Sequence, residues 1–134
     1  MEPHSLALRL ALVGALLAPG CATEPGLLLT GQWGGRLIAL DVGESDAELQ
    51  FACMGAKLPR PTLDAAGHFE GIAQITWVSW AGYSPDGLRV VGDVAGAAMT
   101  LTITYVSSSE AVEPQHYALL RGAPGDFSDV ACLA

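Results

Sequence analysis

The sequence predicts an all-β fold, a small antiparallel up-and-down barrel of about seven or eight strands preceded by a signal segment. Two observations support this. From Leu27 onward, apolar residues recur at every second position, with no long stripe at helical spacing. Turn signals separate these runs at short intervals, which is typical of strands joined in antiparallel order. Such a meander closes on itself to remove its exposed edges.

Four segments alternate most clearly, and in each one every second side chain is expected to face the core. The inward residues are Ile38, Leu40 and Val42 in 36–42, Leu49, Phe51 and Cys53 in 47–53, Met99, Leu101, Ile103 and Tyr105 in 98–106, and Tyr117 and Leu119 in 116–122. Residues 68–77 and 88–94 supply two less regular strands. Tight turns are expected at Asp64–Gly67, Ser84–Gly87 and Asp93–Gly96, each with Asp or Ser first and Gly fourth.

The N-terminal residues resemble a bacterial lipoprotein signal. An apolar run from Leu10 to Ala18 is too short to cross a bilayer but suits the hydrophobic region of an export signal. Cleavage before Cys21 would leave a cysteine that can carry lipid. Cleavage after Ala22 would release a soluble protein, and an uncleaved apolar helix is the third alternative.

The favoured interpretation is a lipoprotein-type signal peptide over 1–20, a tether over 21–26 and a single β-barrel domain over 27–134. It places the protein in the cell envelope, anchored to the membrane through lipid on Cys21. The alternative location is soluble, either secreted or periplasmic.

Cysteine usage agrees with export. Once Cys21 is lipidated or cleaved away, Cys53 and Cys132 remain, and an oxidising compartment joins such a pair as a disulfide. No two cysteines have C-x-x-C spacing, so we expect no metal site and no cofactor. The chain has 14 acidic and 6 basic residues, with the basic ones scattered singly, so we expect no nucleic-acid partner.

The opening of the first barrel strand, Gly31-Gln32-Trp33, resembles the lipocalin-like (calycin) pattern. In that superfamily the tryptophan of a G-x-W motif packs against an arginine from the last strand. The resemblance implies that Arg121 stacks on Trp33 and closes one end of the barrel.

A wider resemblance runs from Leu29 to Cys132. The stretches LTGQWGG, LQFACMGAKL, GDVAGAAMTLTIT and YALLRG, with the terminal cysteine, are similar to a family of small exported bacterial proteins without an assigned activity. The likeness implies the fold and a Cys53–Cys132 disulfide, and it implies no chemistry. The aromatic stretch TWVSWAGYSP departs from that pattern.

No catalytic residues are identified, because no serine has a nucleophile motif and no nucleophile is matched to a base. We therefore expect that the protein is not an enzyme. His68 and Glu70, two apart on a strand, could hold a metal or move a proton, but the sequence shows no third ligand.

The aromatic residues Trp77, Trp80 and Tyr83 are the candidate ligand or partner contacts. Trp77 and Trp80 differ by three positions, so one is expected in the core and the other at the barrel rim. A tryptophan at the rim can stack on a ligand or anchor a partner.

Together these features predict a lipid-anchored envelope accessory protein that binds an unknown small ligand or protein partner. The alternative is a secreted protease inhibitor of calycin type, which would insert its N-terminal segment into the enzyme. An open barrel interior would favour a ligand, and a filled interior with a free N-terminus would favour the inhibitor.

We expect Cys53→Ser and Cys132→Ser to destabilise the protein by similar amounts, and the double variant to be no less stable than either single one. The bridge would close a loop of about 80 residues, for which the chain-entropy estimate is about 4.5 kcal/mol. Urea unfolding followed by circular dichroism measures all three variants. Labelling of both thiols in the folded exported protein would contradict the pairing.

Overall fold

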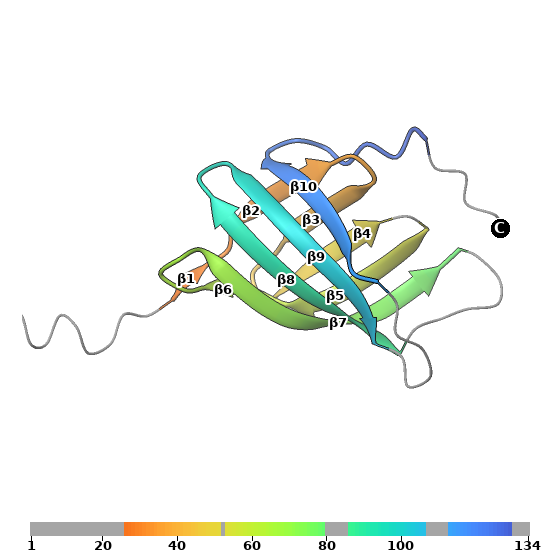
Figure 1. Cartoon of the computed structure of the whole chain (residues 1–134), viewed down its shortest axis with the longest axis horizontal. Coiled ribbons are helices and arrows are strands. Elements are labelled where there is room, and N and C mark those ends of the chain that lie inside the picture. Colours follow the sequence, from red (N-terminus) through yellow and green to blue (C-terminus); the bar gives the residue numbers. More distant parts are fainter. Residues whose placement is uncertain (1–25, 52, 80–85, 107–112, 130–134) are drawn as a thin grey trace, which may run out of the picture.

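The computed structural model describes residues 26–51, 53–79, 86–106 and 113–129 (Figure 1). The strands in these ranges are β1 (Leu27–Leu28), β2 (Gly31–Gly35), β3 (Ile38–Val42), β4 (Asp46–Phe51), β5 (Met54–Pro59), β6 (Thr62–Leu63), β7 (His68–Val78), β8 (Gly87–Ala95), β9 (Ala98–Val106) and β10 (Gln115–Arg121). None of the described ranges contains a helix with the length and hydropathy needed to span a membrane.

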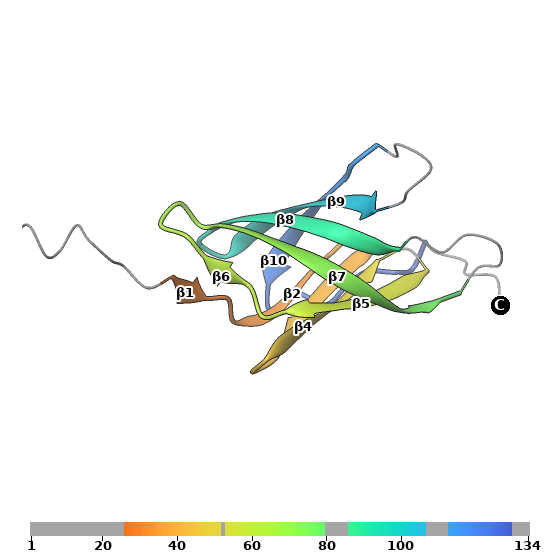
Figure 2. The ribbon, with the colours of Figure 1, turned by 90° about the horizontal axis from the view of Figure 1, so that it is seen from below.

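Eight of these strands form a closed antiparallel barrel in the order β10-β2-β3-β4-β5-β7-β8-β9. Each barrel strand pairs with the next barrel strand along the chain, and β10 returns to β2, so the predicted up-and-down barrel is confirmed. The short strands β1 and β6 pair with each other and lie at one end of the barrel (Figures 1 and 2).

The barrel interior is filled by one apolar core, as side chains can fill a barrel of eight strands. The inward faces predicted from the alternation are confirmed. Nine of the predicted residues are buried: Ile38, Leu40, Leu49, Phe51, Cys53, Met99, Leu101, Ile103 and Leu119. The other three, Val42, Tyr105 and Tyr117, are partly buried and pack against this core. At the centre of the aromatic packing, the ring of Phe51 lies 6.4 Å from that of Tyr105 and 6.0 Å from that of Tyr117, measured between centroids.

The first and last barrel strands meet at Trp33 and Arg121, which are paired in register. The guanidinium carbon of Arg121 lies 4.6 Å from the centroid of the Trp33 ring, and the Trp33 side chain is fully buried. The indole Nε1 donates to the carbonyl oxygen of Thr30 at 2.9 Å, and Arg121 Nη1 donates to the Thr30 hydroxyl at 3.4 Å. This is the stacked closure that the sequence predicted.

Two glycines after Trp33 let backbone approach β2 from both faces. On the outer face, a Cβ on Gly34 would collide with the backbone of Ala123 and Pro124; on the inner face, a Cβ on Gly35 would collide with the carbonyl oxygen of Ala118 in β10. Residues 122–128, which we call the C-terminal strap, therefore lie directly on the outside of β2. Asp126 holds the strap there, since its N–H donates to Gly35 at 2.9 Å and its carbonyl accepts from the N–H of Leu37 at 2.8 Å.

The turn expected at Asp64–Gly67 is confirmed by the Gly67 N–H, which donates to the Asp64 carbonyl at 3.0 Å. The turn expected at Asp93–Gly96 lies two residues later, between the paired residues Ala95 and Ala98. Gly96 takes the first loop position with φ 61°, as a two-residue hairpin requires. Asp93 consequently belongs to β8 and not to the turn. The turn expected at Ser84–Gly87 begins outside the described residues.

Several predicted features lie outside the described residues: the signal peptide over 1–20, the lipidated Cys21, most of the tether over 21–26, Trp80, Tyr83 and Cys132. Cys53 faces the core with 8% of its surface exposed. The Cys53–Cys132 disulfide stays a prediction.

Replacing Trp33 by Ala should lower the free energy of unfolding by about 3–5 kcal/mol, because a fully buried indole is lost. Arg121→Ala should cost about 1 kcal/mol, the scale of one cation–π contact near the surface. Urea unfolding followed by circular dichroism provides the comparison.

The matched control is Arg36→Ala, which removes an ion pair with Asp129 whose two side chains are 77% and 70% exposed. It should cost less than about 0.5 kcal/mol. Equal losses for the two arginine variants would show that the stacking on Trp33 contributes nothing specific.

Candidate functional site on the outer barrel face

A bulge near the end of β7 turns Trp77 outward. Ala56 of β5 is opposite Ile75, but the next residue, Gly55, is opposite Trp77, so Thr76 is an extra residue in β7. Before the bulge, Phe69, Ala73 and Ile75 point toward the core at every second position. In a regular strand Trp77, two residues after Ile75, would continue that inward series. The bulge puts its side chain on the outer face, with 44% of its surface exposed.

The indole of Trp77 lies over Gly55. A Cβ built on Gly55 would collide with Nε1, Cδ1 and Cε2, the atoms of the pyrrole part of the ring. The indole thus occupies the space that a side chain on Gly55 would need, and its contact with β5 at Gly55 fixes the position of the ring. The sequence predicted that one of Trp77 and Trp80 enters the core; Trp77 is at the surface, and Trp80 lies outside the described residues.

Trp77 forms one end of a groove of about 440 Å³ across the outer faces of β2, β3, β4, β5 and β7, which we call the Trp77 groove. One row of groove residues consists of residues that lie opposite one another on neighbouring strands: Ala39, Gln50, Gly55 and Trp77. Small side chains at Ala39 and Gly55 make this row the floor. At β3 the strap comes close, since a Cβ on Gly125 would lie 2.9 Å from the Cβ of Ala39.

A second, polar row borders the groove. Register joins Gln32, Asp41, Glu48 and Lys57 across the same strands, and all four side chains are exposed. The ammonium of Lys57 lies 4.0 Å from a carboxylate oxygen of Glu48 and 3.7 Å from one of Asp46. The row thus offers amide, carboxylate and ammonium groups beside one aromatic surface.

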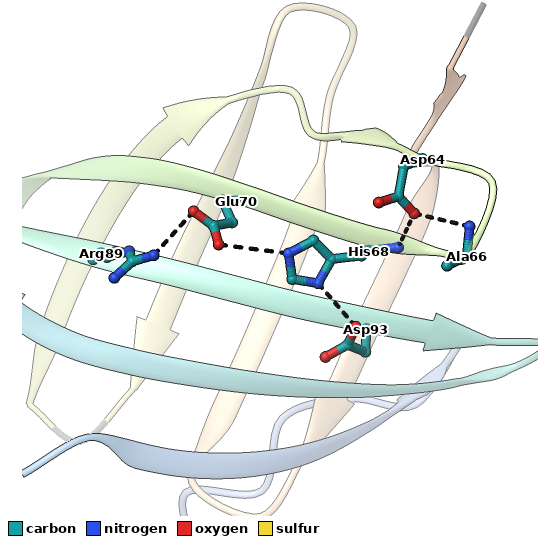
Figure 3. Close-up of polar contacts among 6 residues, drawn as sticks. All are labelled: Asp64, Ala66, His68, Glu70, Arg89 and Asp93. Carbon is teal, nitrogen blue, oxygen red and sulfur yellow. Dashed lines mark hydrogen bonds and ion pairs between the residues drawn. The ribbon is translucent and has the colours of Figure 1, made fainter. Parts of the chain in front are cut away.

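A separate polar cluster lies on the outside of β7 and β8, around His68 (Figure 3). The imidazole Nδ1 is 3.0 Å from Asp93 Oδ1, and Nε2 is 3.5 Å from Glu70 Oε1. Arg89 Nη2 donates to the other oxygen of Glu70 at 3.1 Å. Asp64 caps the preceding turn, its Oδ1 accepting from the backbone N–H groups of Ala66 and His68, each at 2.9 Å.

These contacts shift the ionisation of the cluster. The hydrogen bond with Asp93 is the main cause that raises the pKa of His68 above its ordinary value, and Glu70 adds to it. The hydrogen bond from Arg89 is the main cause that lowers the pKa of Glu70. The hydrogen bond from the backbone of His68 is the main cause that lowers the pKa of Asp64.

The His68 cluster is a charge network rather than a reaction centre. Both ring nitrogens face carboxylates, so neither is directed toward a substrate, and the protonated ring can donate from both. Within the described ranges, no group of three or more His, Cys, Asp or Glu residues is arranged to hold a metal ion.

The sequence placed His68 and Glu70 on one face of a strand, and the structure confirms that placement. The sequence pattern did not identify Asp93 and Arg89 as partners. Both come from β8, and only the strand register between β7 and β8, which pairs His68 with Asp93 and Ile72 with Arg89, brings them into the cluster. The sequence predicts Asp93 both in the strand over 88–94 and as the first residue of a turn, and no pattern in the sequence pairs it with His68.

Comparisons with known protein families, with curated proteins and with solved structures found no match for this chain. The likenesses to calycins and to small exported proteins remain predictions, and the site must be interpreted from its own geometry.

The Asp93→Asn variant should lower the pKa of His68 toward its ordinary value, because it removes the main partner of the imidazolium. The raised pKa stabilises the folded protein below the ordinary pKa of histidine, and this contribution disappears as pH rises through the folded-state pKa. The stability difference between the wild type and Asp93→Asn should therefore shrink from about pH 5 to about pH 8.

Titration of the His68 ring protons by NMR measures the shift, and urea unfolding at several pH values measures the stability. Asp129→Asn is the charge-matched control, since Asp129 pairs with Arg36 and not with His68. A His68 pKa that responds equally to both substitutions would indicate a general charge effect.

Proposed function

We propose that this protein is an exported accessory of the cell envelope that binds a ligand or partner on the outside of its barrel, in the Trp77 groove. The single observation that supports the proposal most strongly is the outward Trp77, turned by a bulge and seated on a glycine above a concave polar surface. Large aromatic side chains next to a few polar groups are the usual composition of recognition sites.

The filled core argues for an exterior site. The barrel interior carries Trp33, Phe51 and Met54, each fully buried, where a ligand-carrying barrel would hold its cargo. A groove of about 440 Å³ on the outer face is within the size range of small-molecule sites, about 300–1,000 Å³.

Export and lipidation rest on the sequence of the first 21 residues. A chain tethered at Cys21 through a short linker would hold the barrel close to the membrane surface, with its outer face open to neighbouring envelope components. The inhibitor alternative depends on an N-terminal segment outside the described residues. The filled interior is consistent with it, but the Trp77 groove has no part in it.

The test is an affinity capture from envelope extract with the tagged wild type, Trp77→Ala and Leu120→Ala. Leu120 is the matched control, an apolar side chain on the outer face of β10 with 58% exposure. We expect mass spectrometry to find a component that the wild type and Leu120→Ala retain and that Trp77→Ala loses. Identical components for all three proteins would overturn the proposal.

A further inference from the structure

We infer that the Trp77 groove binds a neutral oligosaccharide built from pyranose rings with equatorial hydroxyl groups. The inference deepens the proposed function and rests on it, since it names the chemical class of the ligand for the same groove.

The aromatic surface provides the first argument. A pyranose with equatorial hydroxyls presents an apolar face of C–H groups, which stacks on a flat π surface whose face is electron-rich. The pyrrole part of the Trp77 indole is supported by the Gly55 backbone, while 44% of the side chain stays exposed. A supported ring loses little freedom when a sugar stacks on it, so less entropy opposes binding.

The polar row provides the second argument. A sugar hydroxyl donates one hydrogen bond and accepts others, so it needs acceptors and donors side by side. The groove supplies both: carboxylate acceptors at Asp41 and Glu48, the ammonium donor of Lys57, and the amides of Gln32 and Gln50, which donate and accept. Each of these side chains projects from the same sheet face as Trp77.

Charge selects the kind of sugar. Asp41 and Glu48 outweigh the one cation that lines the groove, so an anionic saccharide would be repelled. A cationic ligand would compete with Lys57, whose ammonium already lies within 4.0 Å of Glu48 and 3.7 Å of Asp46. A neutral ligand avoids both costs.

The length of the groove favours an oligomer over a single sugar. The polar and floor rows cross from β2 to β7, four strand-to-strand steps, which is about 19 Å along the sheet. A single ring stacked on Trp77 would leave Asp41 and Gln32, at the far strands, without contact.

The test is isothermal titration calorimetry of the exported protein with three uncharged probes: cellotetraose, maltotetraose and the β-1,4-linked tetramer of N-acetylglucosamine. We expect at least one to bind, and Trp77→Ala to weaken that binding by roughly tenfold or more. Trp77→Phe should keep part of the affinity, and Leu120→Ala should keep all of it. Tetragalacturonate, an anionic probe of the same length, should bind more weakly.

Gly55→Ala tests the position of the ring without removing it. The added methyl group would collide with the Trp77 indole, so the variant should also lose affinity for the sugar. Circular dichroism verifies the fold of each variant. If Gly55→Ala does not fold, Gln50→Ala replaces it, since Gln50 lies on the floor of the groove and is exposed.

The outcomes separate the two proposals. No binding of any saccharide, or binding that Trp77→Ala leaves unchanged, would overturn the oligosaccharide inference. If the envelope extract still yields a protein captured through Trp77, the proposed function stands and the groove is a protein-docking surface. If neither saccharide nor extract component depends on Trp77, both proposals fail.

Discussion

The pairing of β10 with β2 closes the barrel, and it is the shortest ladder in it. Only Leu120 with Gly34 and Arg121 with Trp33 are paired there, whereas β8 and β9 share nine residue pairs. So short a seam needs support from outside the ladder. The Arg121 guanidinium on Trp33 and the strap bonded to Gly35 provide it. Without this closure β2 and β10 would each be left as an exposed sheet edge.

Closure and filling together determine where binding can occur. A barrel of eight strands has an interior that side chains can occupy completely, and here large apolar residues do so. Recognition then falls to the outer face, where strand register aligns side chains in rows. The same strand register that places apolar side chains in the core also brings together the Trp77 groove and the His68 cluster, on different parts of the outer barrel surface.

The fold could be predicted from sequence because its signals are local. Alternation identified the inward faces and short turns imposed antiparallel order. The seam between Trp33 and Arg121 is not a local signal, and only the resemblance to the calycin pattern implied it. The site depends on signals that are not local. The outward turn of Trp77 results from a register shift against β5, and the partners of His68 come from β8. The need for glycine at position 35 becomes apparent only in the folded barrel, where the Ala118 carbonyl of β10 leaves no room for a Cβ.

The bulge at Thr76 means that the groove depends on the register of β7 against β5 and not only on the identity of the residues. If the same residues paired without the bulge, Thr76 would lie opposite Gly55 and Trp77 would turn inward, while the residues before Thr76 kept their pairing. Deletion of Thr76, in contrast, would leave Trp77 opposite Gly55 and facing outward. The position of the indole over Gly55 therefore depends on a register shift of one residue between β5 and β7. Two chains with the same residues in β5 and β7 can thus present different outer faces if only one of them forms the bulge.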